Sequence, residues 1–240
     1  VETATQARAD SQEQLRRFVA DASHELRTPL TTIRGYADLY RQGANSAEQT
    51  DTAMSRIEHE AVRMTALVED LLLLARLDQN RPLNTDSVDI ALLVGQAVDA
   101  ARAVEPTRPI KLDVMGNGGI HIRGDAARLR QAIDNLLANV RAHTAPEAGA
   151  SVRVGAADGQ VTIEVADEGP GMSDEDARHA FERFYQAAGS SARSGTGLGL
   201  AITAAIVEAH HGRIGLSTDL GVGTTFTITL RVADVSSRQA

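Results

Sequence analysis

The first third of the chain contains two long stretches in which apolar residues recur at alternating steps of four and three. This spacing places the apolar side chains in one stripe along a helix and is typical of a coiled-coil-like seam. Between the stretches, residues 43–46 combine a helix stop with a good N-cap, which predicts a helical hairpin. The stripes are Leu15, Val19, Ala22, Leu26, Pro29, Ile33, Tyr36 and Tyr40 in the first helix, and Met54, Ile57, Ala61, Met64, Val68, Leu71 and Ala75 in the second.

The apolar surface of the second helix is wider than a two-stranded seam needs. Four further apolar residues, Leu67, Leu72, Leu73 and Leu74, extend its stripe. A single hairpin cannot bury both apolar faces well, whereas two hairpins can bury them together. We therefore predict that the hairpin pairs with a second copy of the chain and forms a dimeric four-helix bundle.

The pattern changes after a linker at about residues 80–86, which is rich in Arg, Pro, Asn and Asp. Helical and strand-like segments are mixed beyond it without strict βαβ repetition, which favours an α/β sandwich. The predicted helices cover residues 90–104, about 125–142 with Asp125 as N-cap, and 199–210. The predicted strands cover residues 109–115, 152–154 and 161–165, and a closing hairpin of 213–217 with 224–232.

Composition narrows the function classes. The formal net charge of −8 argues against nucleic-acid binding as the main role, so no nucleic-acid partner is expected. The absence of cysteine excludes disulfides and cysteine-based zinc sites. No apolar run approaches the roughly 18 residues that a membrane-spanning helix needs. Because the chain of 240 residues begins with Val1, we expect it to be part of a longer protein.

His24 lies midway between the seam positions Ala22 and Leu26, and therefore on the outer face of the first helix. Another domain could reach an imidazole there. Glu25 could accept the Nδ1 proton and leave Nε2 as a nucleophile. Pro29 inside the helix removes a backbone hydrogen bond at a cost of about 3 kcal/mol, which is rarely tolerated without a reason. An inert, solvated histidine is an equally good interpretation of this segment alone.

Two further segments carry polar groups that suit a ligand. Asn135 and Asn139 are four residues apart and share a helix face, whose carboxamides suit a ligand or metal better than a core. Asp167 follows a predicted strand and precedes Gly169 and Gly171, where a ligand can approach the backbone. Taken singly, each segment is better explained as a solvated helix face or an acidic turn.

The segment from Gly195 to Leu200 has alternating glycines and opens a helix, so its bare N–H groups can bind an anion. A Rossmann motif is excluded because no strand precedes the segment, and a Walker A motif because no lysine follows it. Protein-kinase motifs such as His-Arg-Asp are absent as well. A flexible turn remains an alternative for this segment on its own.

In this order, the segments resemble the sensor histidine kinases of bacterial two-component systems. The resemblance runs from about Leu15 to Leu230. The matching segments are Ser23–Leu30 with the family's H box, Asp134–Thr144 with its N box, Asp167–Gly171 and Gly195–Leu200 with its glycine boxes, Phe181–Tyr185 with its F box, and Gly221–Phe226 with its terminal glycine segment.

The resemblance implies a fold of two domains. Residues 1–82 would form the dimerisation and phosphoacceptor domain, and residues 86–235 a Bergerat-type ATP-binding domain. Residues 172–194 would form a mobile lid over ATP. The chain would be the cytoplasmic portion of a bacterial inner-membrane protein, and this fragment itself would not cross the membrane.

The resemblance also implies a reaction. ATP, with Mg²⁺, would phosphorylate His24 with Glu25 as base, and the phosphoryl group would pass to an Asp of a cognate response regulator. Thr28 matches a position that helps remove phosphate from that regulator. Asn139 would be the Mg²⁺ ligand, supported by Asn135. The nucleotide-binding set would be Asn135, Asn139, His143, Asp167, Gly169, Gly171, Gly195, Thr196, Gly197, Leu198, Gly199 and Thr225.

One position departs from the family pattern. Where the family often has a Lys or Arg facing the phosphates, this chain has Ala142, and the preceding Arg141 is turned by about 100° on the helix. This favours weak ATP binding. It also keeps open a non-catalytic adaptor with a degenerate ATP fold. A chaperone, topoisomerase or mismatch-repair ATPase of the same fold is a further alternative, but the hairpin bearing His24 has no counterpart there.

Overall fold

The structure, a computed structural model, describes residues 2–42, 46–79, 83–116, 119–187 and 195–233, with side chains from residue 18 onward. The chain forms two compact units that divide between Ala75 and Arg76. The domain boundaries expected from the sequence, 1–82 and 86–235, stay a prediction. No helix in the described ranges has the length and apolar character required to span a membrane.

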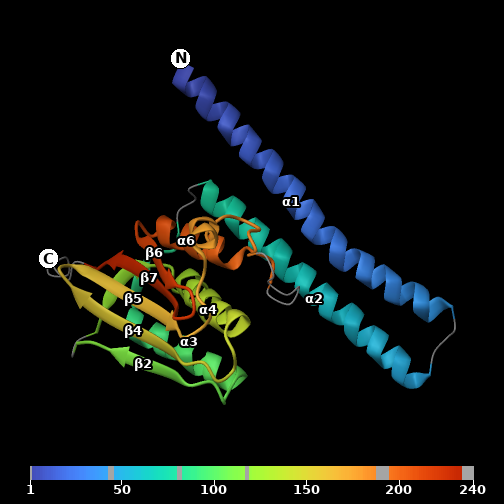
Figure 1. The fold of residues 1–240 in the computed structure, drawn as a ribbon. Coiled ribbons are helices and arrows are strands. Elements are labelled where there is room, and N and C mark those ends of the chain that lie inside the picture. Colours follow the sequence, from blue (N-terminus) through green and yellow to red (C-terminus); the bar gives the residue numbers. More distant parts are fainter. Residues whose placement is uncertain (1, 43–45, 80–82, 117–118, 188–194, 234–240) are drawn as a thin grey trace. The chain divides into compact units, whose positions relative to one another are not determined.

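The first unit is the predicted helical hairpin. Helix α1 spans Glu2–Arg41 and helix α2 spans Ala47–Asp78, and the two run antiparallel (Figure 1). Helix α1 continues through Pro29, whose side chain is buried. The start of α2 is a reciprocal capping pair, because Ser46 Oγ accepts from the Gln49 N–H at 3.3 Å and Gln49 Oε1 accepts from the Ser46 N–H at 3.0 Å. The predicted N-cap is thereby confirmed.

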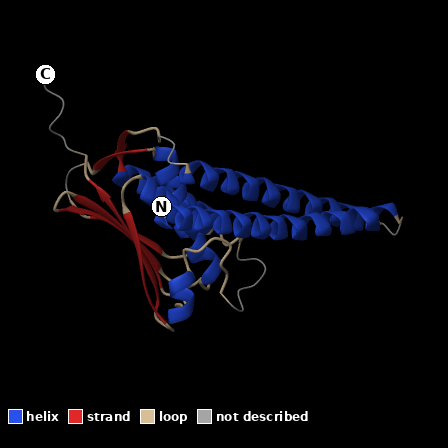
Figure 2. Cartoon of the chain, turned by 90° about the horizontal axis from the view of Figure 1, so that it is seen from above, coloured by secondary structure: helices blue, strands red, loops and turns tan. Residues whose placement is uncertain are grey.

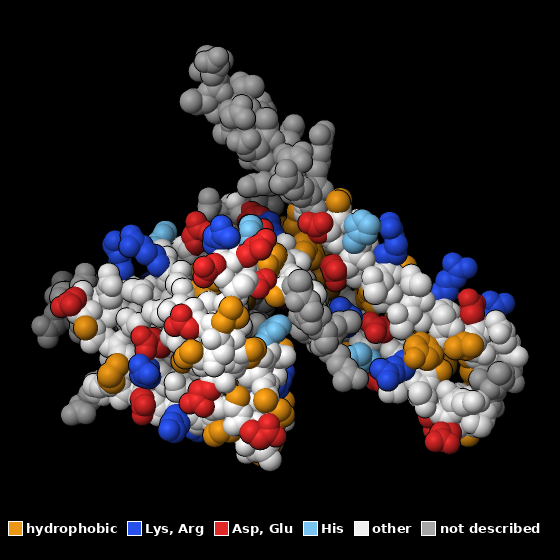
Figure 3. Space-filling view, in the orientation of Figure 1, with side chains coloured by type: hydrophobic (Ala, Val, Ile, Leu, Met, Phe, Trp, Pro, Cys, Tyr) orange, Lys and Arg blue, Asp and Glu red, His pale blue; other side chains and the backbone are white. Residues whose placement is uncertain are grey.

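Only part of the apolar surface of α2 is buried in a single chain. Ala53, Leu67 and Leu74 are buried, whereas their neighbours Met54 and Val68 remain 44% and 42% exposed. The buried positions are thus offset by one residue from part of the predicted stripe. The reason is that the apolar surface of α2 is wider than one packed neighbour can cover. Figure 3 shows apolar side chains at the surface of the molecule among charged ones. On this hairpin the large exposed ones are Val19, Leu30, Leu39, Tyr40, Met54, Val62, Val68 and Leu72.

The second unit is built on a five-stranded mixed sheet. Its strand order is β2-β4-β5-β7-β6, in which β2 and β4 are parallel and the other neighbours are antiparallel. A separate pair of antiparallel strands, β1 and β3, lies outside this sheet. The strands are β1 Asp86–Asp89, β2 Ile110–Val114, β3 His121–Gly124, β4 Ala150–Ala157, β5 Gln160–Asp167, β6 Arg213–Asp219 and β7 Gly223–Arg231.

Three helices, α3 (Ile90–Val104), α4 (Ala126–His143) and α6 (Gly199–Ala209), cover one face of the sheet (Figures 1 and 2). Their apolar sides and alternate strand residues form one hydrophobic core, in which Leu136 and Phe226 are fully buried. The predicted cap is present, since Asp125 Oδ1 accepts from the Arg128 N–H at 3.1 Å. The α/β sandwich inferred from the alternating segments is confirmed.

Two features differ from the sequence prediction. The pairing of β1 with β3 was not expected, because each strand has only four residues and the two are joined by long-range pairing rather than by a turn. The short helix α5 (Asp174–His179) lies inside the segment expected to be a mobile lid. Residues 188–194 of that segment are outside the described residues.

Candidate functional site

The loop after β5 has a backbone that only glycine allows. Asp167 Oδ1 accepts from the Gly169 N–H at 2.9 Å, which turns the chain immediately after the strand. Gly171 has a φ of +68°, and a Cβ at this position would collide with the carbonyl oxygen of Asp219. The loop therefore packs closely against the β6–β7 hairpin and leaves the half-buried carboxylate of Asp167 beside α4.

Two titratable side chains of the site perturb each other. Burial raises the pKa of Asp167, and the N–H groups of Gly169 and Thr224 and the charges of His143 and Arg108 oppose the rise. Desolvation lowers the pKa of His143, and the carboxylate of Asp167 opposes that shift. At neutral pH this combination favours an ionised Asp167 next to an uncharged imidazole, so the site offers a hydrogen-bond acceptor to a ligand.

Helix α4 presents its two asparagines differently. Asn135 Nδ2 donates to the carbonyl oxygen of Gly199 at 3.1 Å and so ties α4 to the start of α6. Asn139 is half-buried, and its carboxamide makes no hydrogen bond within the described part of the chain. An unengaged amide oxygen one helical turn beyond Asn135 fits the oxygen ligand that Mg²⁺ prefers. The described residues contain no cluster of three or more His, Cys, Asp or Glu side chains that could hold a metal.

The second glycine segment is held by the F box and by the residue that follows it. The Phe184 N–H donates to the Gly197 carbonyl at 2.9 Å, and Gln186 Nε2 donates to the Gly195 carbonyl at 3.1 Å. Gly197 has a φ of +69°, and a Cβ there would lie 2.7 Å from the carbonyl carbon of Phe184. Thr196 is half-buried in this turn.

The turn delivers the chain into α6 with Leu198 buried at the N-cap position. Leu198 makes no side-chain cap to the helix, so the N–H groups of the first turn of α6, beginning at Gly199, are available to an anion. A phosphate group would suit such a helix start, because free N–H groups and the positive end of the helix dipole both favour an anion.

The described part of the expected lid is ordered by hydrogen bonds. Ser173 caps α5 through its bond from the Asp176 N–H at 3.1 Å, and Tyr185 Oη donates to Asp176 Oδ1 at 2.7 Å. The Met172 N–H donates to Thr218 Oγ1 at 2.9 Å and anchors the beginning of the segment to β6. Whether the segment closes over a nucleotide stays a prediction.

Strand β7 places Thr224, rather than Thr225, next to Asp167. Asp167 is in register with Thr224 across the β5–β7 pair, and the Thr224 N–H lowers the pKa of the Asp167 carboxyl. Thr224 and Phe226 are buried on the core side, so alternation puts the Thr225 side chain on the opposite face. The residue in register with Asp167 is thus Thr224, and a role of Thr225 in nucleotide binding stays a prediction.

His24 occupies the exposed face of α1, as its position between the seam residues predicts. The side chain of Glu25 is half-buried, and no hydrogen bond joins it to the His24 ring among the described residues. Thr28 Oγ1 donates to the His24 carbonyl oxygen at 3.5 Å, one helical turn away. These residues belong to the first compact unit, whereas the glycine segments, Asp167 and the asparagines belong to the second.

Two family models match the chain in the order of its two units. Residues 14–80 match the His Kinase A (phospho-acceptor) domain. Residues 124–234 match the family described as histidine kinase-, DNA gyrase B-, and HSP90-like ATPase. The first match contains His24 and the second contains every candidate nucleotide-binding residue.

Comparison with individual proteins extends the likeness over nearly the whole chain. The probable sensor histidine kinase TcrY of Mycobacterium tuberculosis is 45% identical over 232 residues, which is 96% of this chain and 48% of TcrY. The full-length structure of ShkA in complex with AMPPNP has a TM-score of 0.67 and 31% identity, covering 92% of this chain and 47% of ShkA. The chain therefore spans about half the length of these relatives.

A third comparison concerns the fold alone. Histidine kinase ThkA in complex with the response regulator protein TrrA has a TM-score of 0.73 at 19% identity, covering 94% of this chain and 64% of that one. The arrangement of a helical hairpin followed by an α/β unit is thus found in solved structures.

Proposed function

This chain belongs to the sensor histidine kinases of two-component systems, and from that premise we propose that it uses ATP to phosphorylate its own His24 and then transfers the phosphoryl group to an Asp of a cognate response regulator. The second unit would bind ATP and the first would carry the phosphoacceptor. The contacts around Asp167, Asn135 and the second glycine segment support this division.

Each part of ATP has a matching group in the second unit. The carboxylate of Asp167 would accept a hydrogen bond from the exocyclic amine of adenine, with Thr224 beside it. The uncapped start of α6 would bind the phosphates through its N–H groups. Asn139 would hold Mg²⁺, which neutralises the charge of the phosphates when bound. Asn135 positions the start of α6 through its bond to Gly199.

The phosphoryl transfer needs a neutral imidazole as nucleophile. Nε2 of His24 would form a bond to the γ-phosphorus while the bond from that phosphorus to the β–γ bridging oxygen breaks, and ADP would leave with the electron pair. The proton on Nδ1 would then be accepted by Glu25. Because adjacent helical side chains diverge by about 100°, Glu25 must rotate toward the ring, and no hydrogen bond among the described residues holds it back.

The exposed apolar line on α2 supports a homodimer. Met54, Val68 and Leu72 lie at the surface of a helix that already buries a parallel line of apolar side chains. A second hairpin would cover them and complete a four-helix bundle. The regulator would then approach the exposed face of α1 around His24 and Thr28.

The observation that carries the proposal is the exposure of His24 on a helix within the phospho-acceptor match. Phosphotransfer profiling tests the complete reaction. The chain is labelled with γ-labelled ATP and Mg²⁺, freed from nucleotide, and mixed with purified receiver proteins from the same organism. We expect one receiver to take the label much faster than the others. Equal and slow transfer to every receiver would contradict a dedicated two-component partner.

Thr28 distinguishes phosphorylation of the chain from dephosphorylation of the receiver. Its hydroxyl lies one turn beyond His24 on the exposed face. Thr28→Ala should leave labelling of the chain unchanged and slow the loss of phosphate from the cognate receiver. Thr31→Ala, which removes another exposed hydroxyl bonded within α1, is the matched control. An unchanged rate of dephosphorylation in the Thr28 variant would remove the phosphatase role from this residue.

A further inference from the structure

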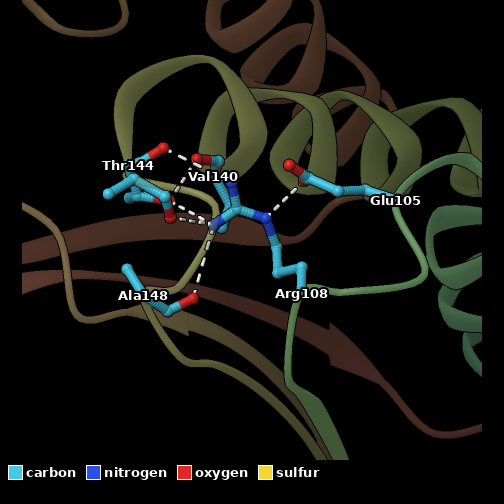
Figure 4. Close-up of polar contacts among 6 residues, drawn as sticks. Glu105, Arg108, Val140, Thr144 and Ala148 are labelled. Carbon is cyan, nitrogen blue, oxygen red and sulfur yellow. Dashed lines mark hydrogen bonds and ion pairs between the residues drawn. The ribbon is translucent and has the colours of Figure 1, made fainter.

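Arg108 is a buried arginine that the proposed mechanism does not use. It keeps only 5% of its surface exposed, and it lies in the turn between α3 and β2. A buried guanidinium destabilises a fold unless all its donors are paired. In this protein each guanidinium nitrogen has an acceptor: Nε donates to Glu105 Oε2 at 2.6 Å, and the two terminal nitrogens donate to Thr144 and to the turn after α4 (Figure 4).

The partners of the two terminal nitrogens lie 36 to 40 residues away in sequence. Nη1 donates to Thr144 Oγ1 at 2.6 Å and to the carbonyl oxygens of Ala145 at 3.0 Å and Ala148 at 3.4 Å. Nη2 donates to the Thr144 carbonyl oxygen at 3.3 Å. Arg108 thus binds the C-cap residue of α4 and the turn that follows it, and this turn leads directly into β4.

Thr144 connects this arrangement to the loop that bears Asp167. Its hydroxyl donates to the Val140 carbonyl at 2.7 Å, which fixes the side chain against the last turn of α4. Its methyl carbon lies only 2.5 Å from where a Cβ of Gly169 would be, so the two segments are in close contact. A second link joins the same segments, because the Glu168 N–H donates to the Gly149 carbonyl at 3.0 Å.

From these contacts we propose that Arg108 is a positioning residue for adenine recognition, which acts through Thr144 and the 145–148 turn to set the position of Gly169 and of the Asp167 carboxylate. The inference rests on the proposed function, because it assumes that Asp167 receives the base. It adds a residue that does not itself touch the nucleotide. A purely structural arginine would stabilise the domain without favouring one base over another.

The positive charge of Arg108 also contributes to the preference for adenine over other bases. The charged and titratable groups that face Asp167 are Arg108 and His143, and burial raises the pKa of Asp167 against their influence. His143 contributes little charge at neutral pH because its own pKa is lowered, whereas an arginine is always protonated. Arg108 therefore favours the ionised carboxylate, which accepts a hydrogen bond from the adenine amine and repels the carbonyl oxygen of hypoxanthine.

Calorimetry with ADP and IDP tests the proposal on the 240-residue chain, because IDP has a carbonyl oxygen in place of the exocyclic amine and a hydrogen on N1. Arg108→Met keeps much of the side-chain volume and removes both charge and donors. We expect its ADP affinity to fall by about tenfold and its IDP affinity to change far less, as for a site that loses a placed polar group. The loss of ADP binding at low pH should also begin at a higher pH than in the unmodified chain.

Arg102→Met is the matched control. Arg102 belongs to the neighbouring helix α3 and also donates to a main-chain oxygen, that of Ile110 at 2.8 Å, but it is exposed and pairs with Asp99. The Arg102→Met variant should keep the ratio of ADP affinity to IDP affinity of the unmodified chain (the ADP/IDP ratio). An Arg108→Met protein that lost affinity for both nucleotides equally, or for neither, would overturn the proposal.

A second variant covers the case in which Arg108→Met does not fold. Thr144→Val keeps the methyl group against Gly169 and removes only the hydroxyl that accepts from Arg108. It should lower the ADP/IDP ratio by a smaller factor, and an unchanged ratio would overturn the proposed route through Thr144. If the unmodified chain binds neither nucleotide, the proposed function itself fails. If it binds both equally, the role of Asp167 in adenine recognition fails, and the positioning role of Arg108 fails with it.

Discussion

The surroundings of His24 and those of Asp167 are organised in opposite ways. Around His24 the side-chain hydrogen bonds are local, such as Ser23 Oγ to the Val19 carbonyl at 2.7 Å, one helical turn away. In the unit that contains Asp167 they also join distant segments, as in the Asn135 bond to Gly199, which spans 64 residues. The proposed phosphoacceptor thus depends on the identity and exposure of one residue, whereas the proposed nucleotide site depends on correct assembly of the fold.

Loss of the proposed metal ligand should have the largest effect in the second region. Asn139→Ala removes the one carboxamide of the α4 pair that has no partner in the described chain. We expect weaker binding of MgATP and phosphorylation reduced to background, with circular dichroism unchanged. Asp134→Ala, on the exposed side of the same helix, is the control, because its surface pair with Arg130 contributes little. Equal MgATP affinity in the Asn139 variant would refute the assignment.

A charge on the exposed line of α2 should disrupt the first region without touching the second. Val68→Asp places one carboxylate from each chain in the proposed dimer interface, and an unpaired buried charge costs several kcal/mol. The unmodified chain should sediment as a dimer at micromolar concentration and the variant as a folded monomer. Ala66→Asp, on the opposite side of the helix, should remain dimeric. A monomeric unmodified chain would contradict the four-helix bundle.

Removing the charge of Asp167 should raise the stability of the fold and weaken the binding of ADP. Burial raises the pKa of this carboxyl above its usual value, so the folded state holds the proton more tightly and loses stability as pH rises through that range. Asp167→Asn should therefore melt at a higher temperature at neutral pH, and the difference should vanish in acid. Its ADP affinity should fall by about tenfold or more, since a hydrogen bond to a charged group contributes about 1.5–3 kcal/mol.

If the Asp167→Asn variant melts at a lower temperature at neutral pH, then the ionised carboxylate stabilises the fold, contrary to the expectation that it destabilises it. ADP binding that stays unchanged would instead remove Asp167 from adenine recognition. The two measurements are independent, because the melt is recorded without nucleotide.

The smallest effect is expected at Ala142, which is exposed in the last turn of α4. Asn135, Asn139 and Ala142 follow helical steps of four and three, so a cation at 142 would point toward the phosphates. Ala142→Lys should tighten ATP severalfold and leave adenosine unchanged, because adenosine has no phosphates. Arg141→Lys keeps a cation on the neighbouring face and should change neither the ATP affinity nor the adenosine affinity. An Ala142 variant without any gain for ATP would show that another residue already supplies this contact.

The sequence predicts the regular elements of this fold better than their long-range contacts. Apolar spacing and caps such as Asp125 and Ser46 are local signals, and the helices begin where those signals place them. The β1–β3 pair was missed because Asp86–Asp89 has no partner within turn distance. Helix α5 was missed because its Ser173 cap lies in a segment whose composition suggested mobility.

The candidate site shows the same limit. Motif order proposes Asp167, the glycines and Thr225, but it cannot show that strand register places Thr224 opposite Asp167. Arg108 could not be found from the sequence at all. It follows a helix end without any periodic pattern, and its partners, Thr144 to Ala148, are specified only by tertiary structure.

The most direct test of the central proposal is the chemistry of the label after incubation with γ-labelled ATP and Mg²⁺. The unmodified chain should carry an acid-labile, base-stable phosphoryl group, as expected for phosphohistidine. His24→Gln should carry none while binding ADP with nearly unchanged affinity, because the exposed imidazole makes no hydrogen bond within the described chain. An acid-stable label, or one that persists on the His24→Gln chain, would contradict the assignment of His24 as the phosphoacceptor.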